Sequence, residues 1–169
     1  REPDLQGLAR LRAAFKEGGT VTAGNSSKIS DGASALVVMS KEKAASLGVK
    51  PMARVVAQAA AGVELEDVLV SPIKSIPKAL KKAGLSLADM DLFEINEAFS
   101  ATTLAVMKAL GIDGNKVNVR GGAVALGHPI GASGARVLTT MLYALKERGL
   151  KRGIASLCLG GGEAVSLIV

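Results

Sequence analysis

The sequence predicts an α/β fold in which helices cover a mixed, five-stranded sheet. From Pro51 onward, apolar runs of strand length alternate with longer segments whose apolar residues recur at three- and four-residue spacing. Glycine or proline separates most of these segments. The chain ends in two apolar runs around Gly160, Gly161 and Gly162, which indicates a hairpin at the end of the sheet.

Composition limits the classes of protein that fit. The 169 residues suffice for one core, or for one domain and part of another. Aromatic residues make up only 2% of the chain, which disfavours single-strand nucleic-acid binding through stacked bases. The 21 basic residues outnumber the 15 acidic ones but are scattered, as on a solvated surface, although an anionic ligand would also suit them. We therefore expect no nucleic-acid partner.

The cysteine count and the apolar runs limit location. A single cysteine, Cys158, excludes an internal disulfide and a multi-cysteine zinc site. No apolar run approaches the ~20 residues that span a bilayer, and no signal peptide opens the chain. We expect a cytoplasmic protein without a membrane partner. Because the chain begins with Arg1 instead of Met, we also expect a piece of a longer protein.

The first fifty residues predict short elements. Leucines at three-residue spacing in residues 5–11 indicate an amphipathic turn or two, and Gly24 to Ser27 form a polar turn. The apolar run 33–39 has strand length, and Ser40 is placed to cap a helix over residues 41–47 that Gly48 ends. Ser27 is by itself as compatible with a turn as with ligand contact.

The elements after Pro51 follow from the same patterns. The expected strands are the apolar runs 52–61, 92–95, 116–119, 153–159 and 163–169. Ser71 and Pro72 predict a helix start, with serine as the cap, and Gly84 predicts its end. Further helices are expected over residues 97–110 and from Gly134 to Gly149.

A glycine-rich stretch, residues 118–136, holds the only histidine of the chain, His128. Five glycines in so short a span indicate backbone that turns tightly or lets another molecule approach closely. The stretch is not a P-loop, because no Gly-Lys-Ser/Thr follows its glycines. It is compatible with a loop that another molecule approaches closely and equally with a plain connection carrying an incidental histidine.

Three polar side chains, Asn96, His128 and Cys158, occur where expected strands give way to loops. Asn96 alone is explained as a helix N-cap, and Cys158 alone as a buried hydrophobic residue. The ends of strands in an open α/β sheet converge at one edge, so we expect the three side chains to share a site. Cysteine beside histidine is a pairing for thiolate chemistry, since the imidazole can take the thiol proton.

The motifs of the chain resemble those of the thiolases. They are NEAF at residues 96–99, GGAVALGHPIGASGAR at 121–136, CLGGGEA at 158–164 and VTAGNSSKISDGASA at 21–35. The resemblance covers the whole chain and corresponds to the later part of a thiolase. It implies a thiolase-like layered α/β fold, with residues 1–50 as the end of the N-terminal half and 51–169 as the C-terminal domain.

The resemblance also implies roles for single residues. His128 is similar to the imidazole that activates the nucleophilic cysteine of the missing N-terminal half and that helps to bind a thioester oxygen in an oxyanion hole. Asn96 is similar to the residue that holds a water in that oxyanion hole. Cys158 resembles the second catalytic cysteine, which moves the α-proton of the attacking acetyl unit. The N–H of Gly160 corresponds to a donor of the second oxyanion hole, and Ser27 to a contact of the pantetheine arm. Arg120 and Glu163 depart from the commonest family pattern.

The expected function is that of an acyltransferase of lipid metabolism, an acetyl-CoA acetyltransferase-type thiolase that condenses two acetyl-CoA to acetoacetyl-CoA and coenzyme A. The alternatives are a degradative 3-ketoacyl-CoA thiolase and, from another class, a non-catalytic thiolase-like binding or assembly module. No cofactor or metal is expected, because the coenzyme A thioester is the substrate. The resemblance further implies a homo-oligomer at full length and no activity for the 169 residues alone.

Overall fold

The computed structural model describes residues 4–169, and the first three residues of the expected leading segment lie outside it. Four strands form one sheet in the order β1-β4-β3-β2. They are β1 (Ala57–Gly62), β2 (Leu92–Ile95), β3 (Gly153–Leu159) and β4 (Glu163–Ile168). β2 pairs with β3 in parallel, and β4 pairs antiparallel with both β3 and β1. The predicted class, α/β with a mixed sheet, is confirmed, but the predicted count of five strands is wrong.

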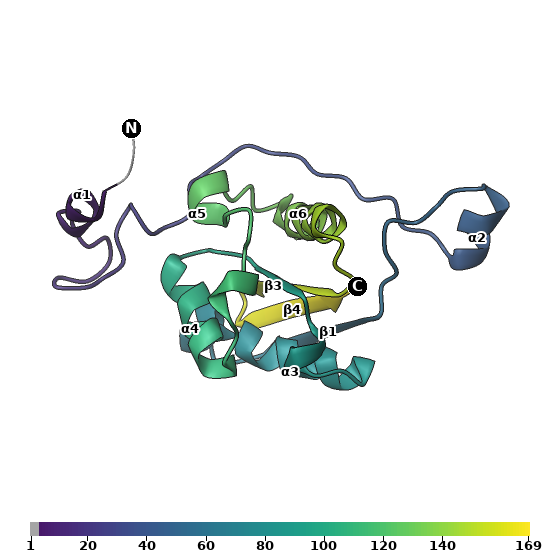
Figure 1. The fold of residues 1–169 in the computed structure, drawn as a ribbon. Coiled ribbons are helices and arrows are strands. Elements are labelled where there is room, and N and C mark those ends of the chain that lie inside the picture. Colours follow the sequence, from purple (N-terminus) through teal and green to yellow (C-terminus); the bar gives the residue numbers. More distant parts are fainter. Residues whose placement is uncertain (1–3) are drawn as a thin grey trace.

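Helices cover both faces of this sheet (Figure 1). α3 (Pro72–Ala83) and α4 (Ser100–Leu110) lie on one face, where Ile76, Phe93 and Ile154 belong to one apolar core. α6 (Ser133–Arg148) lies on the other face, where Val137 and Met141 pack with Ala155 in a second core. The remaining short elements are α1 (Leu5–Ala9), α2 (Lys41–Ser46), η1 (Leu65–Val70), η2 (Leu87–Asp89), η3 (Gly114–Lys116) and α5 (Ala123–Leu126).

Several predicted boundaries are confirmed. Ser40 caps α2 by accepting a hydrogen bond from the backbone N–H of Lys43. Gly84, Gly111 and Gly149 end α3, α4 and α6 in the left-handed conformation that glycine adopts without steric cost. The final two strands form the predicted hairpin, with Leu159 opposite Glu163.

The strand predicted at residues 116–119 is absent. At Asn118 the side-chain amide, instead of the backbone of a continuing strand, pairs with the backbone of β2. Asn118 has a positive φ of 46°, which breaks an extended run. Its Oδ1 accepts from the N–H of Ile95 at 2.8 Å, and its Nδ2 donates to the carbonyl of Ile95 at 2.9 Å. Only one bridge, from Phe93 to Val117, remains of the expected fifth strand. The edge of β2 is thus completed by the side-chain amide of Asn118 and by its backbone N–H, which donates to the carbonyl of Phe93 at 2.9 Å.

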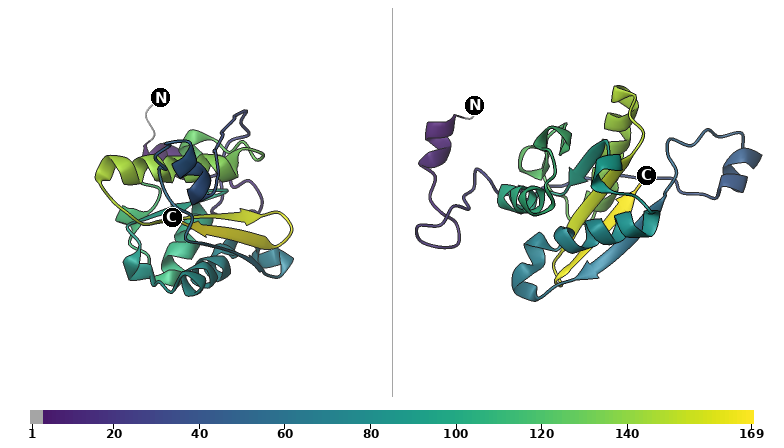
Figure 2. Two further views of the ribbon diagram at one scale, coloured as in Figure 1. Left: turned by 90° about the vertical axis from the view of Figure 1, so that its right-hand side faces the viewer. Right: turned by 60° about the horizontal axis from the view of Figure 1, so that its bottom comes forward.

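The apolar run 33–39 is also not a strand, because no other strand lies beside it. It belongs to a long extended segment that crosses above α5 and α6 between the outlying α1 and α2 (Figures 1 and 2). Val37 and Val38 are 86% and 80% exposed. β-branched residues suit a strand only when neighbouring strands satisfy the backbone and bury the side chains.

Three further expectations are corrected. The strand predicted over 52–61 is shortened at its start, since β1 pairs only with β4, and Ala57 already lies opposite Ile168 near the end of that strand. Ser71 occupies the N-cap position before Pro72, as predicted, but its side chain makes no capping bond; its Oγ lies instead 2.6 Å from the carbonyl of Val68 and 2.8 Å from that of Glu163 on β4. Asn96 does not cap α4, which begins later, at Ser100.

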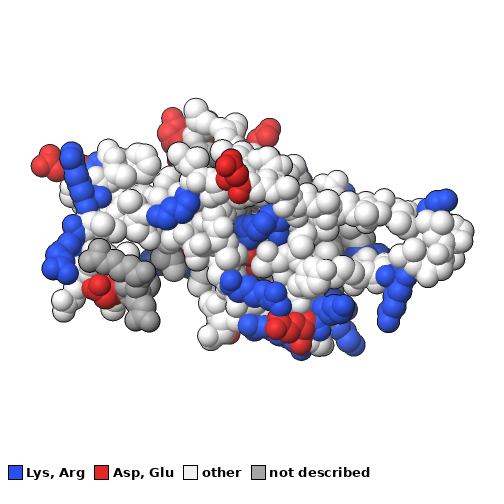
Figure 3. All heavy atoms as spheres, turned by 90° about the horizontal axis from the view of Figure 1, so that it is seen from above, with Lys and Arg blue, Asp and Glu red and all other residues white. Residues whose placement is uncertain are grey.

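The charged side chains are dispersed over the face drawn in Figure 3, with acidic groups among the basic ones and uncharged surface between them. This dispersal matches a solvated surface. Within residues 4–169, none of the helices combines the length and the apolar character needed to cross a membrane.

Candidate active site

His128 lies in the loop between α5 and α6, directly after Gly127. Gly127 has a φ of 98°, and a Cβ there would lie 2.5 Å from Oγ of Ser30. The backbone N–H of His128 lies 3.3 Å from both the carbonyl of Lys28 and Oγ of Ser30. The glycine therefore allows residues 28–30, distant in sequence, to hold the histidine from outside the loop.

Asn96 meets this histidine from the end of β2. Its N–H continues the sheet by donating to the carbonyl of Ser156 on β3 at 2.8 Å. Its side chain, 2% exposed, places Nδ2 3.4 Å from Nε2 of His128. The expected pairing of the strand end with the glycine-rich loop is therefore present as a direct contact.

The other ring nitrogen of His128 contacts Ser133, the first residue of α6. Nδ1 lies 2.6 Å from Oγ of Ser133, and that hydroxyl donates to the carbonyl of Pro129 at 3.0 Å. Burial, and next the positive charge of Arg136, lower the pKa of His128 below its usual value. The lowered pKa favours the neutral imidazole, which is the form that can accept a proton.

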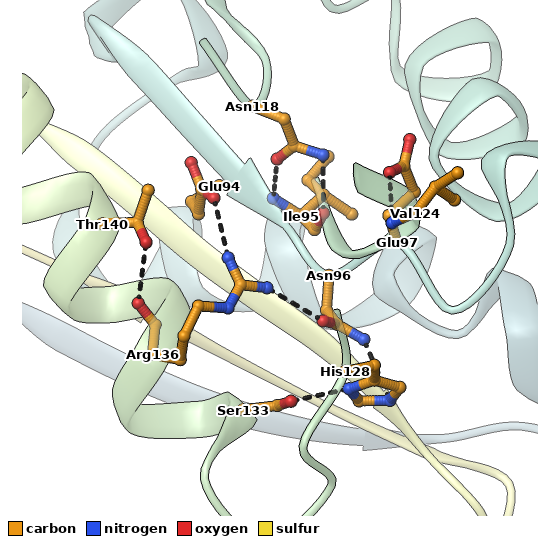
Figure 4. Close-up of polar contacts among 10 residues, drawn as sticks. All are labelled: Glu94, Ile95, Asn96, Glu97, Asn118, Val124, His128, Ser133, Arg136 and Thr140. Carbon is orange, nitrogen blue, oxygen red and sulfur yellow. Dashed lines mark hydrogen bonds and ion pairs between the residues drawn. The ribbon is translucent and has the colours of Figure 1, made fainter. Parts of the chain in front are cut away.

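A buried ion pair lies on the other side of Asn96 (Figure 4). Arg136 of α6 places Nη1 3.3 Å from Oε1 of Glu94 and Nη2 3.3 Å from Oδ1 of Asn96. Glu94 is 2% exposed, and burial raises its pKa to about 7 although Arg136 opposes the rise. Removal from water thus outweighs one charged neighbour at 3.3 Å.

Glu97 connects the residues after β2 to the glycine-rich loop. Its Oε2 accepts a hydrogen bond from the N–H of Val124 at 3.0 Å, at the start of α5. A Cβ on Gly122 would lie 2.4 Å from that oxygen, so a side chain at this position would displace the carboxylate of Glu97. The two segments that carry Asn96 and His128 are therefore joined a second time.

Cys158 lies on the strand beside Asn96, in the penultimate position of β3 and opposite Ala164 of β4. It is partly buried, and burial raises the pKa of its thiol. Within residues 4–169 its sulfur makes no hydrogen bond to Asn96 or His128, so the structure places it at the shared sheet edge without linking it to the pair. Gly160 follows in the exposed hairpin turn, and a Cβ there would meet nothing within 4 Å.

Ser27 lies beside the segment that follows Asn96. Its N–H donates to the carbonyl of Ala98 at 3.0 Å, and the neighbouring Ser26 bridges to Phe99. The ring of Phe99 packs edge-on against Phe15 with centroids 5.7 Å apart. Both rings line an apolar cavity of about 430 Å³ together with residues of η1 and α4.

Sequence reasoning missed the side chains that surround the predicted ones: Glu94, Asn118, Ser133 and Arg136. One signal was present, because Glu94 is a charged residue inside the otherwise apolar strand LFEI. An acid buried in a strand needs a partner, and this requirement points to an arginine without saying which one. The other three lie within the glycine-rich stretch 118–136, but nothing in the sequence distinguishes them from their neighbours there.

The site and the layered fold together define a class of protein, and comparisons with known proteins agree on it. Residues 49–169 match the family model described as thiolase, C-terminal domain, and residues 1–42 match thiolase, N-terminal domain. The chain belongs to the thiolase family.

Particular relatives narrow the comparison. The chain is 54% identical to the acetyl-CoA acetyltransferase of Syntrophomonas wolfei over 171 aligned positions, which cover 100% of the chain and 43% of that protein. It is 52% identical to the acetyl-CoA acetyltransferase of Escherichia coli K12, covering 97% of the chain and 42% of the relative.

Solved structures give the same result. The crystal structure of the Bacillus anthracis acetyl-CoA acetyltransferase superposes with a TM-score of 0.95 at 51% identity, covering 96% of this chain and 41% of that one. Human mitochondrial 3-ketoacyl-CoA thiolase superposes with a TM-score of 0.93 at 40% identity, covering 99% and 42%. The chain thus spans about two fifths of the length of the relatives that it matches.

Proposed function

We propose that this chain supplies the C-terminal part of a thiolase that reversibly condenses two acetyl-CoA to acetoacetyl-CoA and coenzyme A. The observation that carries the proposal is the contact between Asn96 and His128, in which a neutral imidazole is held between an amide and a hydroxyl at the end of β2. The relatives named acetyl-CoA acetyltransferase, at 52% and 54% identity, support the acetyl-specific form. The 3-ketoacyl-CoA thiolase is less similar, at 40%.

The proposed mechanism has two halves. In the first, His128 takes the proton of a cysteine thiol supplied by the N-terminal half, and the resulting thiolate attacks the thioester carbonyl of one acetyl-CoA. Coenzyme A leaves as its thiol after receiving that proton. The side-chain amide of Asn96 and the imidazole, once it has taken that proton, stabilise charge on the carbonyl oxygen, directly or through water. The pKa of His128, lowered mainly by burial, suits it to accept the first proton.

In the second half, the thiolate of Cys158 takes an α-proton from the second acetyl-CoA. The carbanion attacks the acyl-enzyme, acetoacetyl-CoA forms, and the nucleophilic cysteine leaves as a thiolate. Burial raises the pKa of Cys158 in the chain as it stands, which disfavours its thiolate. The base role therefore depends on groups that the rest of the enzyme places near the sulfur.

The cavity beside Phe99 suits the apolar part of a substrate. Its described lining is apolar apart from Thr102, whose buried hydroxyl has no partner. Ser27 borders the same segment, as a contact for the pantetheine arm requires. The apolar portion of an acyl-CoA bound here would contact Phe99 and neighbouring residues, which follow Asn96 closely in the chain.

A chimaera tests the proposal. The 169 residues replace the matching 43% of the Syntrophomonas wolfei enzyme, and acetoacetyl-CoA cleavage by coenzyme A is measured. We expect turnover, a loss of ~10²–10⁴-fold in His128→Ala, and no change in the surface variant Tyr143→Phe. An inactive, folded chimaera would contradict the proposal. A preference for long-chain 3-ketoacyl-CoA would favour the degradative alternative.

Cys158→Ser separates the two halves of the mechanism. We expect condensation to be abolished while the chimaera still forms an acyl-enzyme with acetyl-CoA, which mass spectrometry detects. Loss of acylation along with turnover would refute the division of roles.

The chain alone is expected to show no turnover. Cys158 is its only thiol, so His128 has no separate nucleophile to activate. Activity of the 169-residue chain within ~100-fold of the chimaera would show that Cys158 is the acyl carrier.

A further inference from the structure

Arg136, Asn96 and His128 form a series of contacts in which each donor and each acceptor can be assigned. A guanidinium has only donors, so the atom of Asn96 that faces Arg136 at 3.3 Å must be the acceptor Oδ1. The amide Nδ2, with two donors and no acceptor, then faces Nε2 of His128 at 3.4 Å. Nε2 must therefore carry a lone pair and no proton.

The opposite end of the series is compatible with this assignment. Ser133 has one hydroxyl proton, which can go to the carbonyl of Pro129 at 3.0 Å or to Nδ1 of His128 at 2.6 Å. When it goes to Pro129, the oxygen of Ser133 accepts from Nδ1. Ser133 thus accommodates either tautomer, and the contact with Asn96 selects the one with the proton on Nδ1.

We propose that Arg136, anchored by Glu94, is a positioning residue that fixes the amide orientation of Asn96 and thereby keeps Nε2 of His128 free as the proton-accepting atom. The inference rests on the proposed function for what His128 acts upon, while the tautomer is a property of the chain itself. Glu94 supplies the anchor because it is buried on β2, opposite α6, and holds Nη1 while Nη2 reaches Asn96.

The alternative is that the ion pair only fastens α6 to β2. A purely structural ion pair can be replaced by apolar side chains of similar size with little loss of stability. Such a replacement would leave the tautomer of His128 unchanged if Ser133 sets it alone. Arg136 on α6 is the charged group that lowers the pKa of His128, while Glu94 pairs with Arg136 and is itself affected by the charge of Glu97.

The test uses NMR of the nitrogen-labelled chain, in which the single imidazole gives an unambiguous signal. In the wild type, above the pKa of His128, we expect the Nδ1–H tautomer. In the folded double variant Glu94→Leu/Arg136→Met we expect a mixture with the Nε2–H tautomer and a higher pKa for His128. The matched control is Arg120→Met/Glu147→Leu, which removes the only other Arg–Glu ion pair among residues 4–169 and should change neither quantity.

An unchanged tautomer in the folded double variant would overturn the proposal. If that variant does not fold, Asn96→Asp decides, because it keeps the contact with Arg136 and turns the group facing Nε2 into an acceptor. The proposal then requires the pKa of His128 to rise by about one unit, as beside a carboxylate, and an unchanged pKa refutes it. In the chimaera, the double variant should lower kcat with little change in KM. An inactive wild-type chimaera with the expected tautomer would contradict the proposed function and leave the positioning role intact.

Discussion

The substitution Glu94→Gln probes the energetic consequence of burying a carboxyl group in β2. Glu94 is 2% exposed, and burial raises its pKa from 4.5 to about 7 against the opposing charge of Arg136. The folded state therefore binds this proton more tightly than the unfolded chain does. Consequently the contribution of Glu94 to the free energy of unfolding is largest below pH 4.5 and falls as the pH rises toward about 7.

The size of the effect follows from the shift. One pKa unit corresponds to ~1.4 kcal/mol, so the full shift amounts to about 3 kcal/mol. Roughly 2.5 kcal/mol of this falls between about pH 5 and about pH 8, where the unfolded carboxyl is ionised and the folded one is still losing its proton. Glutamine has the same shape and does not titrate, so the variant should lose this part of the pH dependence.

Urea unfolding of the wild type and Glu94→Gln at the two pH values measures the effect. Between about pH 5 and about pH 8, the free energy of unfolding of the wild type should fall by about 2–3 kcal/mol more than that of Glu94→Gln. Glu64→Gln, which removes an exposed carboxylate, should retain the slope of the wild type. Equal slopes for the wild type and Glu94→Gln would refute the reasoning, since Glu94 would then be ionised in both folded and unfolded states across the range.

Two further predictions concern the connections that support the site. Asn118→Ala should lower the free energy of unfolding by about 2–4 kcal/mol, because both backbone groups of Ile95 lose their partner. In urea unfolding, the stability of Asn118→Asp, which keeps the acceptor, should lie between those of Asn118→Ala and the wild type. Equal stabilities of the three proteins would contradict the role of the amide. Gly122→Ala should cost about 1–3 kcal/mol by displacing Glu97, whose carboxylate would lie 2.4 Å from the new Cβ. Gly131→Ala, which meets open space, is the control in thermal unfolding, and equal melting temperatures would show that Glu97 moves without cost.

The sequence by itself determined several helix boundaries and the family. Glycines marked the ends of α3, α4 and α6, and Ser40 marked the start of α2, because capping and left-handed backbone depend on single residues and their immediate neighbours. The four thiolase motifs were likewise legible in order along the chain, and Asn96 and His128 were expected to meet.

Tertiary structure decided what depends on a partner distant in sequence. The run 33–39 has the composition of a strand but lacks a neighbouring strand, and the run 116–119 gives way to the side chain of Asn118. The assignment of Asn96 was decided in the same way, since an amide can cap a helix or join a site, and Arg136 from α6 engages it in the site. The proton on His128 follows from that contact together with Ser133, because donors and acceptors can be matched only when all the groups around the ring are in place.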